Sequence, residues 1–416
     1  MKAPKTQPRF LSVFLLVLIL LTTTCKDEVI KTITYHAMVP FYLSVSDVRA
    51  QVSVVQAPQE LSMPGKIYLY GKYLFIIEVS KGIHIVDNSN PAAPRFINFI
   101  NIAGNADMAV NSGVLYADNY IDLLAFDVSD PAAIKPLKRV ENVFENLYVD
   151  KAKGIIVGYK DSVITQVSNG NNYPNGYYQN DSRSFAAASG GEQSYGIGGS
   201  TARFTLMNRN LYTVDNFNLK LFNVSNPAEP AYVKTINIGN GIETIFPYRD
   251  KLYIGSTTGM HIYDASNPAS PVKLSTYRHL TSCDPVVVQD NLAYVTLRSG
   301  NFCQQGTNVL QVLNIENASN PVLIASFPML NPHGLSISGS TLFICEGDYG
   351  FKALNSSDAL TIGQKQLSFL KNITATDVIA GPKSLIVTGI KGIYQYDYSD
   401  PSDLKLLSHL SLNKNL

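Results

Sequence analysis

The chain has 416 residues, 45% of them hydrophobic, and a formal net charge of +1. That length can bury one large core or two ordinary ones. The small net charge gives no reason to expect nucleic acid or another polyanion as a partner.

The N-terminal region has the layout of an export signal. Basic residues precede a largely apolar run at 10–21, in which Ser12 is the one polar residue, and small residues then lead to Cys25. This run is too short to span a bilayer as a helix, so residues 1–24 are predicted to be a secretory signal peptide. The position of Cys25 resembles a bacterial lipobox, whose Cys carries the lipid. Three threonines before Cys25 depart from the usual pattern and leave ordinary signal cleavage as the alternative.

Residues 25–61 are predicted to be a lipidated tether with a short buttress segment. Lys26-Asp27-Glu28 resembles the tag of Bacteroidota lipoproteins displayed on the cell surface. A solvated charge run after a cleavage site is the alternative. Ser44, three residues before Asp47, is expected to cap a short helix.

One short stretch then recurs along the chain. GIHIVDNSNPAAP at 82–94 returns as GMHIYDASNPASP at 259–271 and as GIYQYDYSDPSDL at 392–404. Aligning such stretches gives eight anchor positions with a period of about 40 residues, as in four-stranded propeller blades. The anchors are Asp87, Asp127, Gln166, Asn223, Asp264, Asn314, Asn355 and Asp397. Each unit contains short β-rich runs separated by turn residues.

The anchor side chains are expected to make turns. An Asp or Asn that precedes Ser and then Pro can fold back onto its own backbone as an Asx turn, and Pro stops the strand. Metal binding by these residues is the alternative. It is weakened because Asn223, Asn314 and Asn355 share the position, and an amide lacks the charge that a hard cation favours.

The string Gly-Ile-His-Ile-Val-Asp-Asn-Ser-Asn-Pro resembles the LVIVD-repeat family over roughly residues 62–412. The resemblance implies a β-propeller and, in many members, a bacterial lipoprotein. We therefore expect an all-β chain that forms a β-propeller of four-stranded antiparallel blades at 62–416. Eight blades are predicted, and the degenerate unit around Gln166 leaves seven as the alternative.

A polar insertion interrupts the repeats at 169–200. Its content of Asn, Gly, Ser and Tyr cannot form a packed core, so it is predicted to be flexible. A Tyr-rich contact surface is the alternative.

Ionisable residues stand at the start of each predicted innermost strand, and five of them are acidic. They are Lys66, Asp107, Glu145, Arg203, Glu243, Asp284, His333 and Asp377. We predict that they encircle the mouth of the central channel and bind a ligand. A polar lining of a wet channel is the alternative. No cofactor is expected, and a bound cation such as calcium is compatible with the acids but has no further support.

Two cysteines are predicted to form a disulfide. Cys283 and Cys303 belong to loops of one unit that emerge on one face, and an exported protein permits the bond. Cys345 is expected to be a small buried residue inside a strand.

These features favour an outer-membrane lipoprotein, on the cell surface or facing the periplasm. It would contact the membrane through the lipid on Cys25 and bind an envelope protein or glycan. The alternative is an envelope hydrolase or lyase whose acid and base are two of the five acidic residues at the channel mouth. These five are Asp107, Glu145, Glu243, Asp284 and Asp377. A scaffold without a small ligand is the third hypothesis. The sequence leaves catalysis open and favours binding.

Overall fold

The computed structural model describes residues 31–144, 149–150, 152–168, 197–278, 285–299 and 307–413. The chain divides into a smaller unit, 1–41 with 156–180, and a larger unit, 42–155 with 181–416. The smaller unit holds most of β1 (Lys31–Leu43) and β12 (Gly154–Ser168). These strands form a sheet in the order β1-β12-β11, where β11 is Val149–Asp150.

The larger unit is built from four-stranded antiparallel blades, numbered here in chain order. Blade 1 comprises β3 (Pro64–Tyr70), β4 (Tyr73–Glu78), β5 (Gly82–Asp87) and β6 (Arg95–Asn101). Blade 2 comprises β7 (Met108–Asn111), β8 (Val114–Asn119), β9 (Asp122–Asp127) and β10 (Lys135–Val140). Blade 3 comprises β14 (Phe204–Met207), β15 (Asn210–Val214), β16 (Asn218–Asn223) and β17 (Ala231–Asn237).

The remaining blades repeat this order. Blade 4 comprises β18 (Ile242–Tyr248), β19 (Lys251–Ser256), β20 (Gly259–Asp264) and β21 (Val272–Arg278). Blade 5 comprises β22 (Val286–Gln289), β23 (Leu292–Leu297), β24 (Val309–Asn314) and β25 (Val322–Pro328). Blade 6 comprises β26 (Leu335–Ser338), β27 (Thr341–Cys345), β28 (Phe351–Asn355) and β29 (Gln366–Leu370), with a 3-10 turn at Ile362–Gln364. Blade 7 comprises β30 (Asp377–Ala380), β31 (Leu385–Gly389), β32 (Gly392–Asp397) and β33 (Lys405–Ser411).

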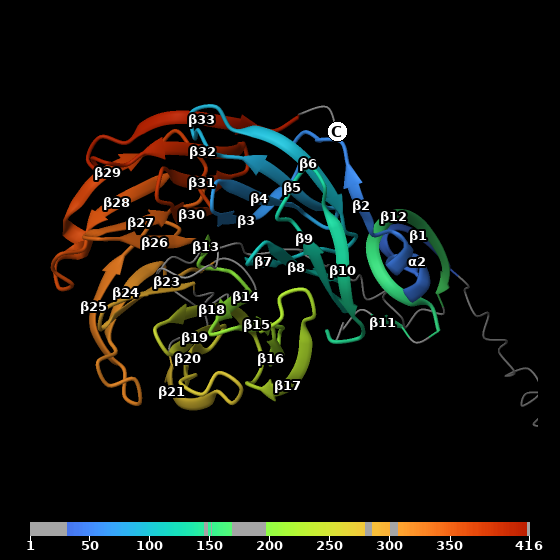
Figure 1. Cartoon of the computed structure of the whole chain (residues 1–416), viewed down its shortest axis with the longest axis horizontal. Helices are drawn as coiled ribbons and strands as arrows, with labels where there is room; N and C mark the ends of the chain where they lie inside the picture. The colour runs from blue at the N-terminus through green and yellow to red at the C-terminus, as the bar shows by residue number, and fades with distance from the viewer. Residues whose placement is uncertain are drawn as a thin grey trace, which may run out of the picture. The chain divides into compact units, whose positions relative to one another are not determined.

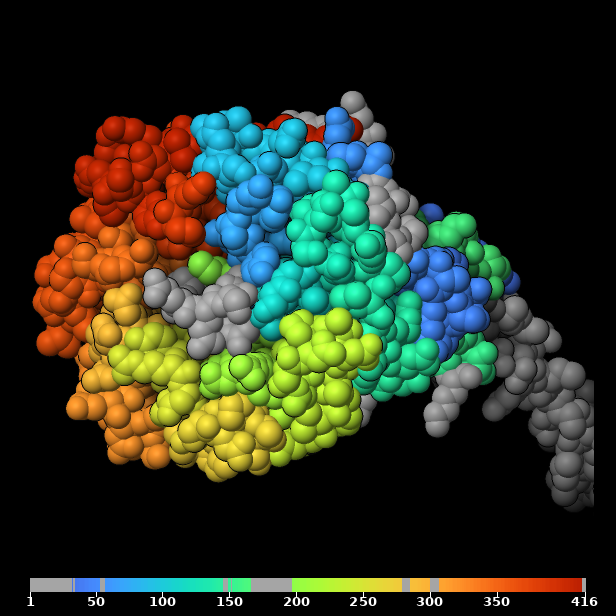
Figure 2. All heavy atoms as spheres, in the orientation of Figure 1, coloured from blue at the N-terminus to red at the C-terminus, as the bar shows by residue number. Residues whose placement is uncertain are grey.

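Each innermost strand contacts the next around the ring, in the order β3, β7, β14, β18, β22, β26 and β30, and β31 of blade 7 contacts β3. Figure 2 shows the red atoms of blade 7 against the blue atoms of blade 1. The predicted all-β propeller of four-stranded antiparallel blades is therefore confirmed. Within the described residues eight sheets form, and seven of them close the ring, the alternative count that the sequence left open. The segment around Gln166 lies in β12.

The anchors end the third strand of every blade, and all seven make the predicted Asx turn. In each, the anchor oxygen accepts a hydrogen bond of 2.8–3.0 Å from the backbone N–H two residues on. At the other end of the same strand, Gly82 has φ +149°, and a Cβ there would lie 2.0 Å from the Ile100 carbonyl oxygen. Local backbone chemistry thus explains why the stretch recurs.

The prolines that follow the anchors also join neighbouring blades. The Tyr116 hydroxyl donates to the Pro227 carbonyl at 2.8 Å, and the Tyr212 hydroxyl donates to the Pro268 carbonyl at 2.6 Å. Blade 7 joins blade 1 in the same way, because Ser408 donates to the Pro91 carbonyl at 2.6 Å. The repeated stretch therefore fixes both its own turn and the seam between blades.

The antiparallel strand order gives the ring two faces. The turns after the third strands emerge on one, called the Asx-turn face. The loops from second to third strand, and from each blade to the next, emerge on the other, called the loop face.

The segment before blade 1 is attached at the rim of the loop face. Helix α2 (Val45–Ala50) is capped as predicted, since the Ser44 hydroxyl accepts a hydrogen bond from the Asp47 N–H. Strand β2 (Ser53–Gln56) then pairs with the outer edge of β6. No helix in the described ranges has the length and hydropathy needed to span a membrane.

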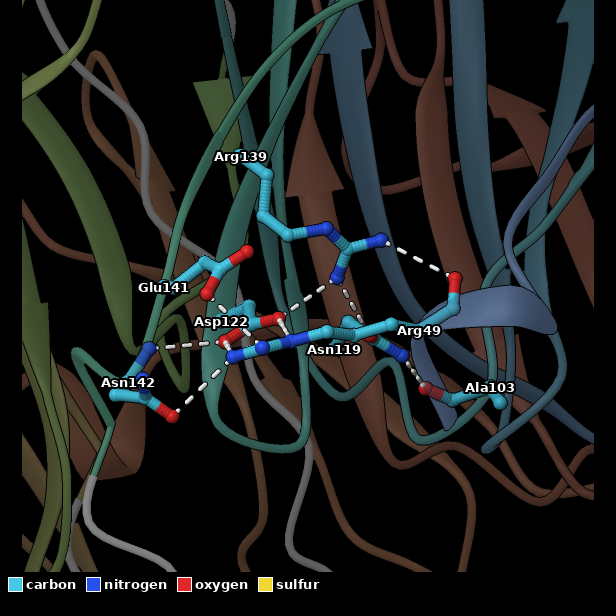
Figure 3. A network of polar contacts seen from close by, with 7 residues as sticks. All are labelled: Arg49, Ala103, Asn119, Asp122, Arg139, Glu141 and Asn142. Atoms are coloured by element: carbon cyan, nitrogen blue, oxygen red, sulfur yellow. Dashed lines mark hydrogen bonds and ion pairs between the residues drawn. The ribbon is translucent and has the colours of Figure 1, made fainter. Parts of the chain in front are cut away.

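An ion-pair network holds α2 in place (Figure 3). Arg49 makes two hydrogen bonds to Asp122 of blade 2, at 2.8 and 3.0 Å, and Arg139 contacts the same carboxylate at 2.7 Å. Burial would raise the pKa of Asp122, but hydrogen bonds from Arg49, Asn142 and Arg139 outweigh it and lower the pKa. We call this network the rim clamp. It fixes α2 to one place on the ring.

Candidate functional site

The structure places six of the predicted channel-mouth residues at the loop-face end of the innermost strands. Glu145 and Asp284 lie outside the described residues. Lys66, Glu243 and Asp377 belong to β3, β18 and β30, and Asp107 and Arg203 directly precede β7 and β14. His333 lies two residues before β26. The predicted position around the axis is thus reached from six blades, but the six side chains differ in exposure.

The channel that these residues surround is not open water, because a segment of the chain runs through it. Strand β13 (Ile197–Gly198) pairs with β3, near the centre of the ring in Figure 1. The Ser200 hydroxyl then accepts a hydrogen bond from the Leu335 N–H at 3.1 Å, and the Ala202 carbonyl accepts one from the Ile245 N–H at 2.8 Å. We call residues 197–202 the channel segment. It touches blades 1, 4 and 6.

The channel segment was not anticipated from the sequence, which assigned residues 197–200 to a flexible insertion. Gly198, Ser200 and Ala202 are small, as the narrow space between seven innermost strands requires. Ser200 is fully buried. This run of small residues is the signal that could have identified it.

Two of the predicted residues form a buried ion pair. Lys66 and Asp107 are 6% and 3% exposed, and the Lys66 ammonium donates to the Asp107 carboxylate. The same carboxylate accepts a hydrogen bond from the Arg203 N–H. Burial lowers the pKa of Lys66, although the Asp107 charge opposes that shift. This pair holds blades 1, 2 and 3 together at the mouth.

Asp377 lies in the same cluster without a partner for one of its oxygens. It is fully buried, its Oδ1 accepts from the Val378 N–H at 2.8 Å, and its Oδ2 has no hydrogen bond. Burial raises the pKa of Asp377 well above its usual range, and the hydrogen bond from Val378 and the Lys66 charge do not compensate. The pKa of nearby Asp118 is also raised, chiefly by burial.

His333 is half-buried, and burial together with the Arg298 charge lowers its pKa to about 3. It is therefore neutral at physiological pH.

An acid and base for hydrolysis would need carboxyl groups within reach of a substrate. Asp107 and Asp377 are 3% and 0% exposed, which disfavours them in that role.

Of the predicted mouth residues that the structure describes, Arg203 and Glu243 lie at the surface of blades 3 and 4. The Arg203 side chain is exposed, Glu243 is half-exposed, and the Arg203 Nε donates to the Glu243 carbonyl at 3.3 Å. Around them on the loop face of blades 3 and 4 stand other exposed polar side chains. We call this set the polar sector: Arg203, Asn216, Asn240, Glu243 and Arg278.

The polar sector is continuous. The Asn216 side-chain amide donates to the Asn240 side-chain oxygen at 3.4 Å, and the Asn216 backbone carbonyl accepts from the Ile242 N–H at 3.1 Å. In the described loops of blades 2 to 4 on this face, no large apolar side chain is exposed. The sector therefore offers amide, guanidinium and carboxylate groups on a polar surface.

Metal and thiol chemistry have little support in the described ranges. They contain no group of three His, Cys, Asp or Glu side chains placed to hold a metal ion. Cys345 is a buried free thiol, as predicted, and burial raises its pKa. Cys25, Cys283 and Cys303 lie outside the described residues, so the lipid and the disulfide remain predictions.

The comparisons with known proteins agree with the fold. No curated protein sequence matches the chain. Two solved propellers resemble it with a TM-score of 0.52: the computationally designed Ika8 and Sqt1 of Saccharomyces cerevisiae. Ika8 is 7% identical and the match covers 86% of this chain and 92% of Ika8; for Sqt1 the values are 8%, 86% and 89%. At such identities the likeness shows the fold alone.

The LVIVD repeat matches the chain at residues 64–101 and 250–278. The first segment spans blade 1, and the second spans the last three strands of blade 4. These are two of the places where the recurrent stretch is best preserved. The resemblance to the repeat family is thus supported in the two segments that the comparison matches.

Proposed function

We propose that this chain is a lipid-anchored interaction module of the bacterial outer membrane, which binds an envelope protein or glycan through the polar sector. The lipid on Cys25 and the surface-display tag at Lys26-Asp27-Glu28 supply the location. The propeller fold supplies a rigid ring whose loops carry the binding groups. Envelope hydrolysis is the weaker alternative, because the two described acids closest to the channel are buried.

One observation carries the proposal. Of the predicted mouth residues that the structure describes, Arg203 and Glu243 stand on adjacent blades, side by side, with their surroundings exposed and polar. Guanidinium, amide and carboxylate groups together can donate to and accept from sugar hydroxyls or a polar protein surface.

The test uses the mature chain from Lys26, immobilised and exposed to outer-membrane extract. Wild-type protein should retain a component that Arg203→Ala binds about tenfold more weakly, as for a residue near the centre of a contact. Arg95→Ala is the matched control. Arg95 is exposed at the start of β6 on the Asx-turn face, and its loss should change nothing.

Protease treatment of the extract should remove a protein ligand, and periodate treatment should remove a glycan. Retention that survives both Arg203→Ala and Asn240→Asp would contradict the proposed site. Retention of nothing by the wild-type chain would contradict the function itself.

A further inference from the structure

Exposed apolar side chains gather on the loop face across the ring from the polar sector. Four of them stand on loops of blades 6, 7 and 1, which are consecutive in the ring. We call them the apolar arc: Leu330, Tyr349, Ile390 and Met63, with exposed fractions of 45%, 54%, 64% and 60%. Such side chains cost free energy in water, which a partner surface would relieve.

Contacts among the loops make the arc continuous. Leu330 and Tyr349 are held by one residue, since the Leu330 N–H donates to the Glu346 carboxylate at 3.0 Å and the Tyr349 N–H donates to the Glu346 carbonyl at 3.0 Å. Gly347 of the same loop pairs with Ala375, in the loop that enters blade 7.

The arc continues past Ile390 to the start of blade 1. Ile390 lies in the turn before Gly392, which pairs with Ser411. Asn413 then donates to the Leu61 carbonyl at 2.8 Å, two residues before Met63. The four side chains therefore follow one side of the loop face.

Basic groups border the arc. Three lysines are exposed in the same loops, Lys81, Lys371 and Lys391, and two carboxylates are exposed there, Glu60 and Asp348. Aliphatic and aromatic side chains on separate loop tips, with lysines around them, are the pattern of proteins that lie on an anionic lipid surface. A protein partner would instead favour anchors that converge in one packed cluster.

The attachment of α2 to the ring also favours a lipid surface as the partner of the arc. The rim clamp holds α2 at the loop face of blade 2. At the same face of blade 1, which also carries Met63 of the arc, the Asn101 side chain donates to the Gln51 carbonyl after α2 at 2.6 Å. From α2 onward the chain therefore joins the ring on the face that carries the arc. From these observations we propose that the apolar arc docks on the surface of the lipid bilayer.

Docking by this side would tilt the ring on the membrane. Blades 6, 7 and 1 would face the lipid, and the polar sector of blades 3 and 4, across the ring, would stay open to ligands at the bilayer surface. The inference shares the predicted lipid with the proposed function, but its test needs neither the lipid nor the ligand.

The test is co-sedimentation of the mature chain from Lys26 with vesicles. This chain keeps every described residue and lacks Cys25, so the lipid cannot contribute to binding. Wild-type protein should sediment with phosphatidylcholine vesicles that contain phosphatidylglycerol, and less with pure phosphatidylcholine or at high salt. Ile390→Asp should lower the partition coefficient roughly tenfold, and Lys391→Ala roughly fivefold.

Val272→Asp is the matched control. Val272 is 62% exposed at the start of β21 on the Asx-turn face, and its substitution should leave sedimentation unchanged. Equal losses for Val272→Asp and Ile390→Asp, or no wild-type sedimentation, would overturn the proposal. If Ile390→Asp instead removed an envelope protein from the extract assay while vesicles bound neither form, the arc would be a protein docking surface. Failure of the polar-sector variants alone would leave this inference intact.

Discussion

Blades 2 and 7 place an aspartate at the same repeat position, and the two side chains have opposite electrostatic roles. Asp107 accepts from the Lys66 ammonium and from two backbone N–H groups. Asp377 accepts from one backbone N–H and leaves its other oxygen without a partner. Both are buried, so the difference lies in what surrounds them. A repeat fixes where a side chain stands, and its neighbours decide whether it carries charge.

The largest change in the free energy of unfolding is expected when the charge of Asp107, the aspartate paired with Lys66, is removed. Asp107→Asn leaves the Lys66 ammonium buried without its counter-charge, and the free energy of unfolding should fall by about 3–5 kcal/mol. Urea unfolding followed by tyrosine fluorescence measures it, since the chain has 24 tyrosines and no tryptophan.

The pair can also be replaced as a whole. The double variant Lys66→Met with Asp107→Asn removes both charges and keeps an amide oxygen for the backbone N–H groups, so most of the stability lost in Asp107→Asn should return. A cost below about 1 kcal/mol for Asp107→Asn would mean that the ion pair contributes no more than an exposed one.

A smaller effect is expected at Glu78 of blade 1, another buried and fully paired carboxylate. Burial would raise its pKa, but hydrogen bonds from His84, Ser62 and the backbone lower the pKa to about 2 from the ordinary 4.5. A lowered folded pKa stabilises the protein above the unfolded value, and that stability is lost as pH falls from 4.5 towards 2. At about 1.4 kcal/mol per unit, the contribution near neutral pH is roughly 3 kcal/mol.

Glu78→Gln tests this sign. The difference in unfolding free energy between wild type and Glu78→Gln should be about 2–3 kcal/mol near neutral pH and should shrink below about pH 4. Titrating groups that do not contact Glu78, such as His333, act equally in both proteins and cancel in the difference. A gap that stays constant with pH would show that Glu78 contributes through packing rather than charge.

The sequence predicted what local chemistry determines. The Asx turns and hairpin glycines depend on residues next to one another, so the anchors, the strands and the ring position of the ionisable residues could be derived from the repeat. The third repeat failed as a blade because its residues pair with β1, far away in the chain.

Exposure of the candidate site could not be predicted in the same way. It depends on the channel segment, which comes from an insertion outside the repeat and fills the space that the mouth residues surround. The apolar arc was also missed, because Met63, Leu330 and Ile390 lie in loops whose length and register vary between blades. Non-local contacts thus decided which predicted residues reach solvent.

The smallest change in the free energy of unfolding is expected for Asp377, the aspartate with one unpaired oxygen. Burial raises its pKa, so its neutral form stabilises the fold below the ordinary value of 3.8, and that stability is lost as pH rises through the folded pKa. An asparagine has nearly the same shape, can still accept from the Val378 N–H and cannot ionise. Asp377→Asn should therefore differ from wild type by less than about 1 kcal/mol near pH 4 and become the more stable protein towards about pH 8. Paired unfolding curves at the two pH values measure this crossover. If Asp377→Asn cost as much as Asp107→Asn at both values, Asp377 would be an ionised partner of Lys66, and the contrast between the two blades would disappear.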